Sequence, residues 1–195
     1  FLNRFNHENS YKDGDTKLSV ANYVTIQDGT YNAVWMIAGF DLEHNQTAAD
    51  GTVYDNGYGI CMIPKTIVTT GQWKSSTDLT GAYMASTMHT STLPTIVNNL
   101  RNVLGPHIVN RNVLLSSSVD SNHKSNAYTW TTSYATLMST VQIKSTTFGM
   151  YMNKYDYGEA TYKLPVFGHI DYAIGGNSDF WMRGVKGLGT SIFGW

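Results

Sequence analysis

One stretch of the chain has the hydrophobic period of a helix, and this stretch limits the fold more than any other feature. Its apolar residues recur three and four positions apart: Leu93, Ile96, Val97, Leu100, Val103 and Leu104. Thr92 stands where an N-cap belongs, Pro94 falls in the first turn, and Gly105 with Pro106 forms a stop signal. The sequence therefore predicts a helix over residues 91–105, with Thr92 as its N-cap.

The other apolar runs are short and typical of strands. Residues 23–26 and 33–37 flank the turn-forming sequence of residues 27–30, which predicts a hairpin. A shorter helix is predicted at residues 82–89, and a short turn or helix near residues 133–141. Further strands and a polar loop are predicted at these positions: strands at 58–63, 108–109, 113–115 and 128–130, and the loop at 116–126.

These elements predict an α+β fold that is rich in loops, with two central helices and short antiparallel strands. A chain of 195 residues is long enough to bury one core. Residues 1–17 are polar with few apolar anchors, so we expect an N-terminal arm or linker there and a single domain over residues 18–195. Because the chain begins at Phe1, we expect a processed product or a fragment of a longer protein.

Charged residues make up only 14% of the chain, and the formal net charge is −1. Thr, Ser, Asn and aromatic residues supply the surface polarity in their place. A chain without a basic patch lacks the electrostatic attraction that nucleic acids and anionic membranes require. No run approaches the roughly 20 apolar residues of a membrane span. We therefore expect neither nucleic acid nor a membrane as a partner.

Cys61 is the only cysteine, which excludes an internal disulfide and any zinc site that needs two thiolates from this chain. It is a potential nucleophile, but it lies in the apolar run of residues 59–63, where burial raises the pKa of a thiol. A buried, inert cysteine is the favoured interpretation. The histidines stand singly without metal-ligand spacing, which is typical of surface or hydrogen-bonded residues: His7, His44, His89, His107, His123 and His169.

Asp50, Asp55 and Asn56 offer oxygen atoms around two glycines, so a calcium site is one interpretation. Their spacing is not that of an EF-hand, and Asp-Gly and Asn-Gly pairs are common turn formers, so turns are favoured. The nucleotide-binding, serine-hydrolase and zinc-protease motifs are all missing from the sequence. We expect no metal and no cofactor.

Two polar groupings are candidates for function. Asp41 and Glu43 form a close acidic pair, for which Arg183, next to aromatic residues, is the expected partner. The second grouping is a tyrosine-rich segment with amide and carboxylate groups, as in sugar or protein recognition. Its members are Tyr151, Asn153, Tyr155, Asp156 and Tyr157, and the alternative is that this segment packs on its own domain. Asn45 begins a glycosylation sequon, which matters only in a secretory pathway.

Several segments, taken in their order along the chain, resemble one domain family. They are residues 35–41 (WMIAGFD), 59–64 (GICMIP), 81–88 (GAYMASTM), 136–142 (TLMSTVQ) with 148–149, 164–167 (LPVF) and 179–183 (DFWMR). Over residues 18–195 the chain resembles the C-type-lectin-like domain family of tailed-phage virion proteins and some bacterial surface proteins, a distant relative of the folds of formylglycine-generating enzymes.

The resemblance implies a C-type-lectin-like fold in which Trp35 and Trp181 are core aromatics and Arg183 is structural, with Asp41 as its expected structural partner. Formylglycine-generating enzymes use paired cysteines, so the single Cys61 excludes that oxidase chemistry. The Glu-Pro-Asn, Gln-Pro-Asp and Trp-Asn-Asp triplets of calcium-dependent lectins do not occur, which argues against calcium-dependent sugar binding.

The resemblance leads us to expect a non-enzymatic structural protein on the exterior of a phage particle, as a capsid decoration, head fibre or tail component. Other virion proteins and further copies of the chain, in a homo-oligomer, are the expected partners. The alternative is a carbohydrate-binding adhesin or receptor-binding domain that recognises a host-surface glycan through residues 151–162 and 118–126. A third interpretation is a hydrolase that uses Asp41 or Glu43 in a cleft.

Overall fold

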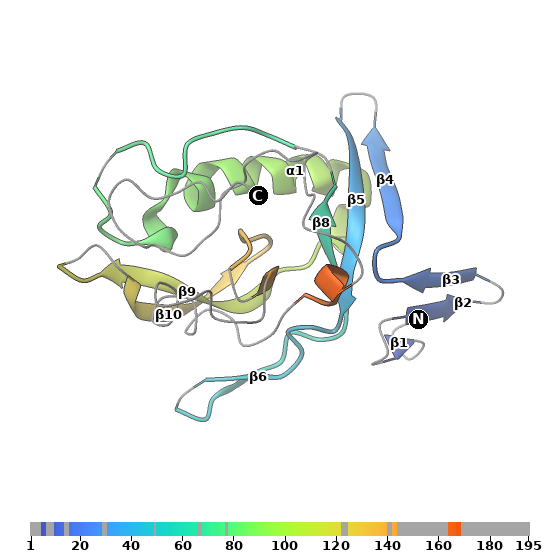
Figure 1. Ribbon diagram of the computed structural model, residues 1–195, viewed down its shortest axis with the longest axis horizontal. Helices are drawn as coiled ribbons and strands as arrows, with labels where there is room; N and C mark the ends of the chain where they lie inside the picture. Colours follow the sequence, from blue (N-terminus) through green and yellow to red (C-terminus); the bar gives the residue numbers. More distant parts are fainter. Residues whose placement is uncertain are drawn as a thin grey trace. The chain divides into compact units, whose positions relative to one another are not determined.

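The computed structural model describes much of the chain, in ten segments. They are residues 5–6, 10–13, 16–28, 31–48, 50–65, 68–76, 78–121, 125–139, 142–143 and 164–168. The chain divides into two compact units, which we call unit 1 (Phe1–Val68 and Leu164–Gly176) and unit 2 (Thr69–Lys163 and Asn177–Trp195). One α-helix and several short antiparallel sheets make up the described parts (Figure 1), which confirms the α+β class. The C-type-lectin-like fold and the boundary at residue 18 stay predictions.

The main sheet of unit 1 has the strand order β4–β5–β8. It contains β4 (Tyr23–Asp28), β5 (Tyr31–Phe40) and β8 (Ile60–Pro64), all antiparallel to their neighbours. Asp28 of β4 lies opposite Tyr31 of β5, so the predicted hairpin is confirmed. The register between β5 and β8 shifts between Ile37 and Gly39.

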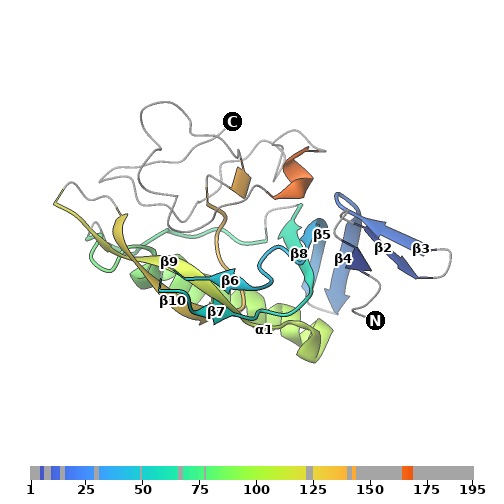
Figure 2. The same ribbon diagram turned by 90° about the horizontal axis from the view of Figure 1, so that it is seen from below.

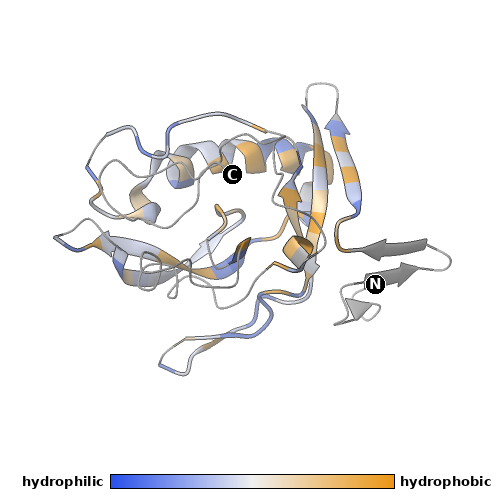
Figure 3. Cartoon of the chain, in the orientation of Figure 1, coloured by the Kyte–Doolittle hydropathy of each residue, from blue (hydrophilic) through white to orange (hydrophobic). Residues whose placement is uncertain are grey.

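Strand β5 is the centre of this sheet because its apolar residues follow one another without alternation. The hydropathy colours show orange bands along β5 (Figure 3), and every residue from Trp35 to Phe40 is buried. A strand of this kind needs cover on both faces. The short 3₁₀ helix η6 (Pro165–Gly168) packs against β5 and contributes to the same core. That core contains Val20, Ile26, Ala33, Trp35, Met36, Ile37, Ala38, Phe40, Ile63, Leu164, Val166 and Phe167.

Two smaller sheets complete the described part of unit 1. Near the N-terminus, β1 (Phe5–Asn6), β2 (Ser10–Asp13) and β3 (Thr16–Ser19) form an antiparallel sheet in that order. Between β5 and β8 the chain makes an excursion that we call the 41–59 loop. It contains the paired strands β6 (Gln46–Thr47) and β7 (Val53–Tyr54), which lie side by side and project from the ends of β5 and β8 (Figure 2).

Unit 2 contains the predicted helix, α1 (Leu93–Leu104), whose buried side chains lie on one face: Leu93, Ile96, Val97 and Leu100. The helix ends at Gly105, which has a φ of 57° and donates its N–H to the carbonyl of Arg101. Thr92 as an N-cap is wrong: it is helical and makes no capping bond through its side chain, because the π-helix η3 (Met88–Thr92) runs directly into α1.

The predicted helix at residues 82–89 is replaced by two shorter elements, the 3₁₀ helix η2 (Tyr83–Ala85) and η3. A 3₁₀ turn, η4 (Gly105–His107), follows α1, and residues 108–109 are not a strand because the chain is still leaving this turn. No helix forms over residues 134–139, where a turn or helix was predicted.

Strands β9 (Arg111–Val119) and β10 (Ser125–Ser133) form an antiparallel two-stranded sheet with register shifts on either side of Ala127. The strands predicted at 113–115 and 128–130 are confirmed. The predicted polar loop is too long, because residues 116–119 and 125–126 belong to the strands. Their Ser and Asn side chains suggested a loop, yet in the sheet they form hydrogen bonds across the strands.

Candidate functional site

Most of the residues that the sequence proposes for ligand contact lie outside the described residues. These are Tyr151, Asn153, Tyr155, Asp156 and Tyr157, and the same holds for Trp181 and Arg183. The pairing of Asp41 with Arg183 therefore stays a prediction. Trp35 is buried in β5 and donates its indole N–H to the hydroxyl of Tyr31 over 3.1 Å. Asp41 is the first residue of the 41–59 loop.

Asp41 closes the 41–59 loop at its base. Its backbone N–H donates to the carbonyl of Gly59 over 2.9 Å, and its Oδ1 accepts the N–H of Gly59 over 2.8 Å. Asp41 has a φ of 55°, a left-handed conformation that aspartate tolerates better than most residues. A second tie joins the two arms of the loop, because the side-chain amide of Asn56 donates to the carbonyl of Glu43 over 2.9 Å.

The three candidate calcium ligands have roles in turns. Oδ1 of Asp50 accepts the N–H of Thr52 over 2.9 Å, and this bond lowers the pKa of the carboxyl. Oδ1 of Asp55 accepts the N–H of Gly57 over 2.8 Å. Asn56 donates its amide nitrogen to the carbonyl of Glu43, in the tie between the two arms of the loop. Among the described residues, no group of three or more His, Cys, Asp or Glu side chains is placed to hold a metal ion.

A histidine and a tyrosine stack on each other in this loop. The ring centroids of His44 and Tyr58 are 4.2 Å apart and the rings are inclined by 25°. Nε2 of His44 lies 3.0 Å from the side-chain nitrogen of Asn45, and Nδ1 lies 3.6 Å from Oδ1 of Asp55. Because an amide nitrogen only donates, Nε2 of His44 accepts the bond from Asn45.

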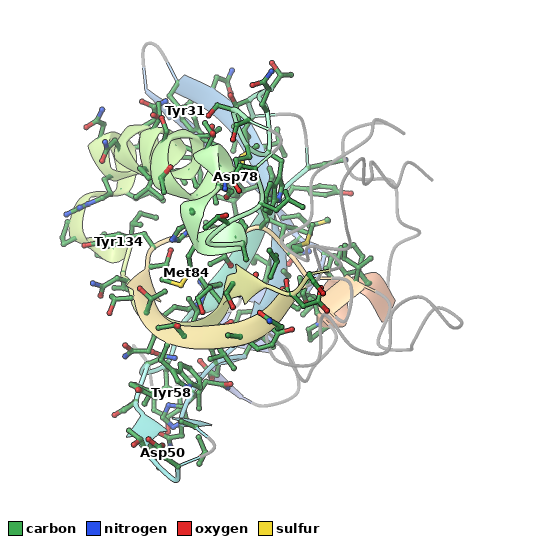
Figure 4. All side chains as sticks on the ribbon, turned by 90° about the vertical axis from the view of Figure 1, so that its left-hand side faces the viewer. Tyr31, Asp50, Tyr58, Asp78, Met84 and Tyr134 are labelled. Atoms are coloured by element: carbon green, nitrogen blue, oxygen red, sulfur yellow. The ribbon has the colours of Figure 1, made fainter. Side chains whose placement is uncertain are left out.

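We call these four residues, His44, Asn45, Asp55 and Tyr58, the Tyr58 cluster. Figure 4 shows Tyr58 and Asp50 on the same projecting segment, with Asp50 at its far end. The side chain of Tyr58 is 47% exposed, although its ring is held on one face by His44. Sequence reasoning missed this cluster, since His44 and Tyr58 are far apart in the chain and neither belongs to a motif. The turn-forming residues Asp55 and Gly57 were the only indication in the sequence that the chain turns back toward His44 at this point.

Two other exposed tyrosines in the described part have a different neighbour. The ammonium of Lys65 lies 3.7 Å from the ring centre of Tyr23, which is 55% exposed. The guanidinium of Arg101 lies 5.0 Å from the ring centre of Tyr134. Both are cation–π contacts, in which the cation occupies a ring face.

Unit 2 holds a second histidine and tyrosine in contact, in its interior. Tyr83 is fully buried, and its hydroxyl accepts the N–H of Leu137 over 2.8 Å. The ring of His89 lies 5.1 Å from that of Tyr83, at 45°. Burial lowers the pKa of His89. The backbone N–H of His89 donates to Oγ of Ser86, and Ser86 is also fully buried. This cluster joins η2, η3 and the segment after β10, which indicates a structural role.

The sheet of β9 and β10 carries neutral polar side chains that bond to one another. Oγ of Ser118 donates to Oδ1 of Asn126 over 2.6 Å, and Oγ1 of Thr129 donates to Oγ of Ser117 over 2.9 Å. A longer bond of 3.4 Å joins Thr132 to Asn112. We call these six residues the hydroxyl ladder. Cross-strand pairs of this kind stabilise a sheet without charge.

Cys61 lies in β8, and burial raises the pKa of its thiol to about 11. The shift has the predicted direction, although Cys61 is half-buried by surface exposure and not fully buried as predicted. Since the thiolate is the reactive form, such a thiol is a poor nucleophile near neutral pH.

No helix in the described segments has both the length and the apolar character that are needed to cross a membrane. Comparisons of the whole chain with known proteins give no matching family model, no matching curated protein and no matching solved structure.

Proposed function

We propose that this chain is a non-enzymatic structural protein on the exterior of a phage particle, where it contacts other virion proteins as a capsid decoration, head fibre or tail component. The order of the sequence segments that resemble the phage family supports the proposed location on a phage particle. The hydroxyl ladder is the structural observation that carries the proposal, since its neutral side chains lie on both faces of the two-stranded sheet and those of Asn126, Thr129 and Thr132 are exposed.

The physical argument concerns the cost of burying a surface against a neighbour. Charged groups lose much hydration when they enter an interface, and protein interfaces are accordingly poor in charge at their centres. The side chains of the hydroxyl ladder are neutral, and their hydrogen bonds are already made within the sheet. A neighbouring subunit therefore packs on them at a small cost in desolvation.

The arrangement of Asp41 and Glu43 favours a structural role over hydrolysis. The carboxylate of Asp41 accepts a backbone N–H at the base of the 41–59 loop. Glu43 is half-buried, and its carbonyl receives the amide of Asn56. Both residues thus take part in holding the loop.

Antibody labelling of purified phage particles tests the location. We expect gold-conjugated antibody against this chain to label intact particles, and mass spectrometry of the same particles to detect many copies. Particles that carry neither label nor peptide would overturn the proposal.

A charge added to the hydroxyl ladder tests the contact surface. We expect Thr129→Lys to lower the number of copies per particle, because the interface then contains an unpaired ammonium. Asn98→Lys is the matched control, since Asn98 is exposed on α1 and outside the ladder. Equal incorporation of both variants would show that the ladder is not a contact surface.

Carbohydrate binding stays the second candidate function, and one observation favours it. The Tyr58 cluster combines an exposed aromatic ring, stacked on His44, with a carboxylate and an amide that lie against the same histidine, and sugar recognition uses groups of these kinds.

A further inference from the structure

We infer that the Tyr58 cluster is a saccharide-binding site that works without calcium and prefers neutral sugars. The inference rests on the surface location proposed above and names the ligand class of the host contact. It also places that contact in the 41–59 loop, away from the tyrosine-rich segment that the sequence proposed.

The platform of the site is the ring of Tyr58. A pyranose ring has a face of C–H groups, which packs on an aromatic face in the same way as other apolar groups. His44 covers one face of Tyr58 at 4.2 Å and fixes the orientation of the ring. Tyr58 nevertheless remains 47% exposed, and the inference assigns the ligand to the ring face opposite His44.

The polar groups of the site lie against His44, the ring that stacks on this platform. The side chain of Asp55 is 72% exposed, and its Oδ1 is engaged by Gly57. Its Oδ2 makes no hydrogen bond to the described residues and can accept sugar hydroxyls, and bonds to a charged acceptor are strong. Asn45 directs its amide nitrogen to His44, which leaves the amide oxygen as a second acceptor.

The loop holds these groups in place before a ligand arrives. The two bonds between Asp41 and Gly59 close its base, and the bond from Asn56 to Glu43 joins its arms. Gly57 has a φ of 66°, so the turn next to Tyr58 depends on a residue without a side chain. A site that is already ordered loses little conformational entropy on binding.

The other exposed tyrosines do not share this arrangement. Tyr23 and Tyr134 each have a cation against the ring, from Lys65 and Arg101. Of these three tyrosines, Tyr58 is the one that stacks on a second aromatic ring, His44, and Nδ1 of this histidine lies 3.6 Å from the carboxylate of Asp55. The charge of Asp55 also predicts which sugars bind, because it repels the carboxylate of an acidic sugar.

Saturation-transfer NMR on the purified chain tests the inference with a fixed panel of sugars. The neutral arm consists of glucose, galactose, rhamnose and N-acetylglucosamine at millimolar concentration, and glucuronic acid is the anionic arm. We expect transfer to the ring C–H protons of at least one neutral sugar, and weaker transfer to glucuronic acid. No transfer to any of the four neutral sugars would overturn the inference.

Variants locate the binding on the molecule. We expect Tyr58→Ala to weaken binding by about tenfold or more, which is the loss of one good apolar contact. Asp55→Asn keeps the acceptor for Gly57 and should weaken binding less, while it abolishes the discrimination against glucuronic acid. Tyr23→Ala is the matched control, because Tyr23 is as exposed as Tyr58.

Binding that is unchanged in Tyr58→Ala, or weakened equally in Tyr23→Ala, would contradict the assignment to the Tyr58 cluster. The test uses the isolated chain, so its outcome is independent of particle labelling. A chain that binds sugar but is absent from particles would overturn the proposed location alone. A chain that is present on particles but binds none of the sugars would overturn this inference alone.

Discussion

Among the described residues, one contact between a histidine and a tyrosine is found in each unit, and the two contacts differ in how far they are exposed. In unit 1, His44 stacks on Tyr58 in a projecting loop, and Tyr58 is 47% exposed. In unit 2, His89 lies against Tyr83, which has no exposed surface and whose hydroxyl is bonded to Leu137. The same two residue types thus serve a surface in one unit and a core in the other.

The difference shows that burial, rather than residue type, determines what such a pair does. A buried tyrosine contributes its apolar area and one hydrogen bond to folding, and both are lost when it is removed. An exposed tyrosine contributes little to folding, so its ring is available for a ligand. Variants of the two pairs test this contrast.

The largest effect is expected from Tyr83→Ala. Removal of a buried aromatic side chain leaves a cavity, and we expect unit 2 to lose about 3–5 kcal/mol of unfolding free energy. Tyr83→Phe keeps the ring and removes only the acceptor for Leu137, at a cost of about 1–2 kcal/mol. Urea unfolding followed by circular dichroism measures both values. Equal losses in the two variants would show that the hydroxyl, and not the packing of the ring, carries the stability.

A smaller loss is expected from Gly81→Ala, two residues before Tyr83. Gly81 has a φ of 78°, and a Cβ built on it would lie 2.5 Å from the Cβ of Ala85. Strain and clash together should cost about 2–3 kcal/mol. Gly51→Ala is the control, because Gly51 has a φ of 85° but nothing within 4 Å of the added Cβ, so only strain of about 1 kcal/mol applies. If Gly81→Ala and Gly51→Ala lose the same unfolding free energy, the contact with Ala85 does not contribute to the loss.

The elements that sequence reasoning predicted best are those whose signal is local. The apolar period placed α1 to within two residues of its ends, and the Asp28 turn placed the hairpin of β4 and β5. The cap at Thr92 was predicted wrongly because the π-helix before α1 has no sequence signal of its own. Ser117, Ser118 and Asn126 of the hydroxyl ladder were predicted to lie in a loop, since Ser and Asn favour loops unless a partner strand offers them hydrogen bonds.

The candidate site was predicted only in part. The turns at Asp50 and Asp55 follow from local chemistry, because the side chain accepts a backbone N–H two residues ahead. Asp41 and Glu43 were identified as a pair, but the structure uses Asp41 to hold Gly59, a contact across the loop. The stacking of His44 on Tyr58 depends on that closure, and no pattern within either sequence segment encodes it.

The buried pair should also make stability depend on pH. Burial lowers the pKa of His89, so the folded chain takes up this proton less readily than the unfolded chain does. Above the ordinary pKa of histidine both states are neutral and the effect is absent. As the pH falls below that value, the unfolded state gains the proton first and the folded state loses stability.

We therefore expect the melting temperature of unit 2 to fall between about pH 7 and about pH 5. The variant His89→Phe, which keeps a ring against Tyr83, should reduce this slope. His107→Phe changes a histidine on the surface and is the control. Identical slopes in the wild-type chain and in His89→Phe would show that His89 does not contribute to the pH dependence.

The smallest effect on stability is expected from Tyr58→Ala, and this result bears most directly on the contrast. The ring is exposed and its partner His44 retains its contacts with Asn45 and Asp55, so the unfolding free energy should change by no more than about 0.5 kcal/mol. Urea unfolding of unit 1 measures it. A loss comparable to that of Tyr83→Ala would mean that Tyr58 serves the fold, and weaker sugar binding in this variant would then reflect a disordered loop. A negligible loss combined with weaker binding assigns the ring to the ligand.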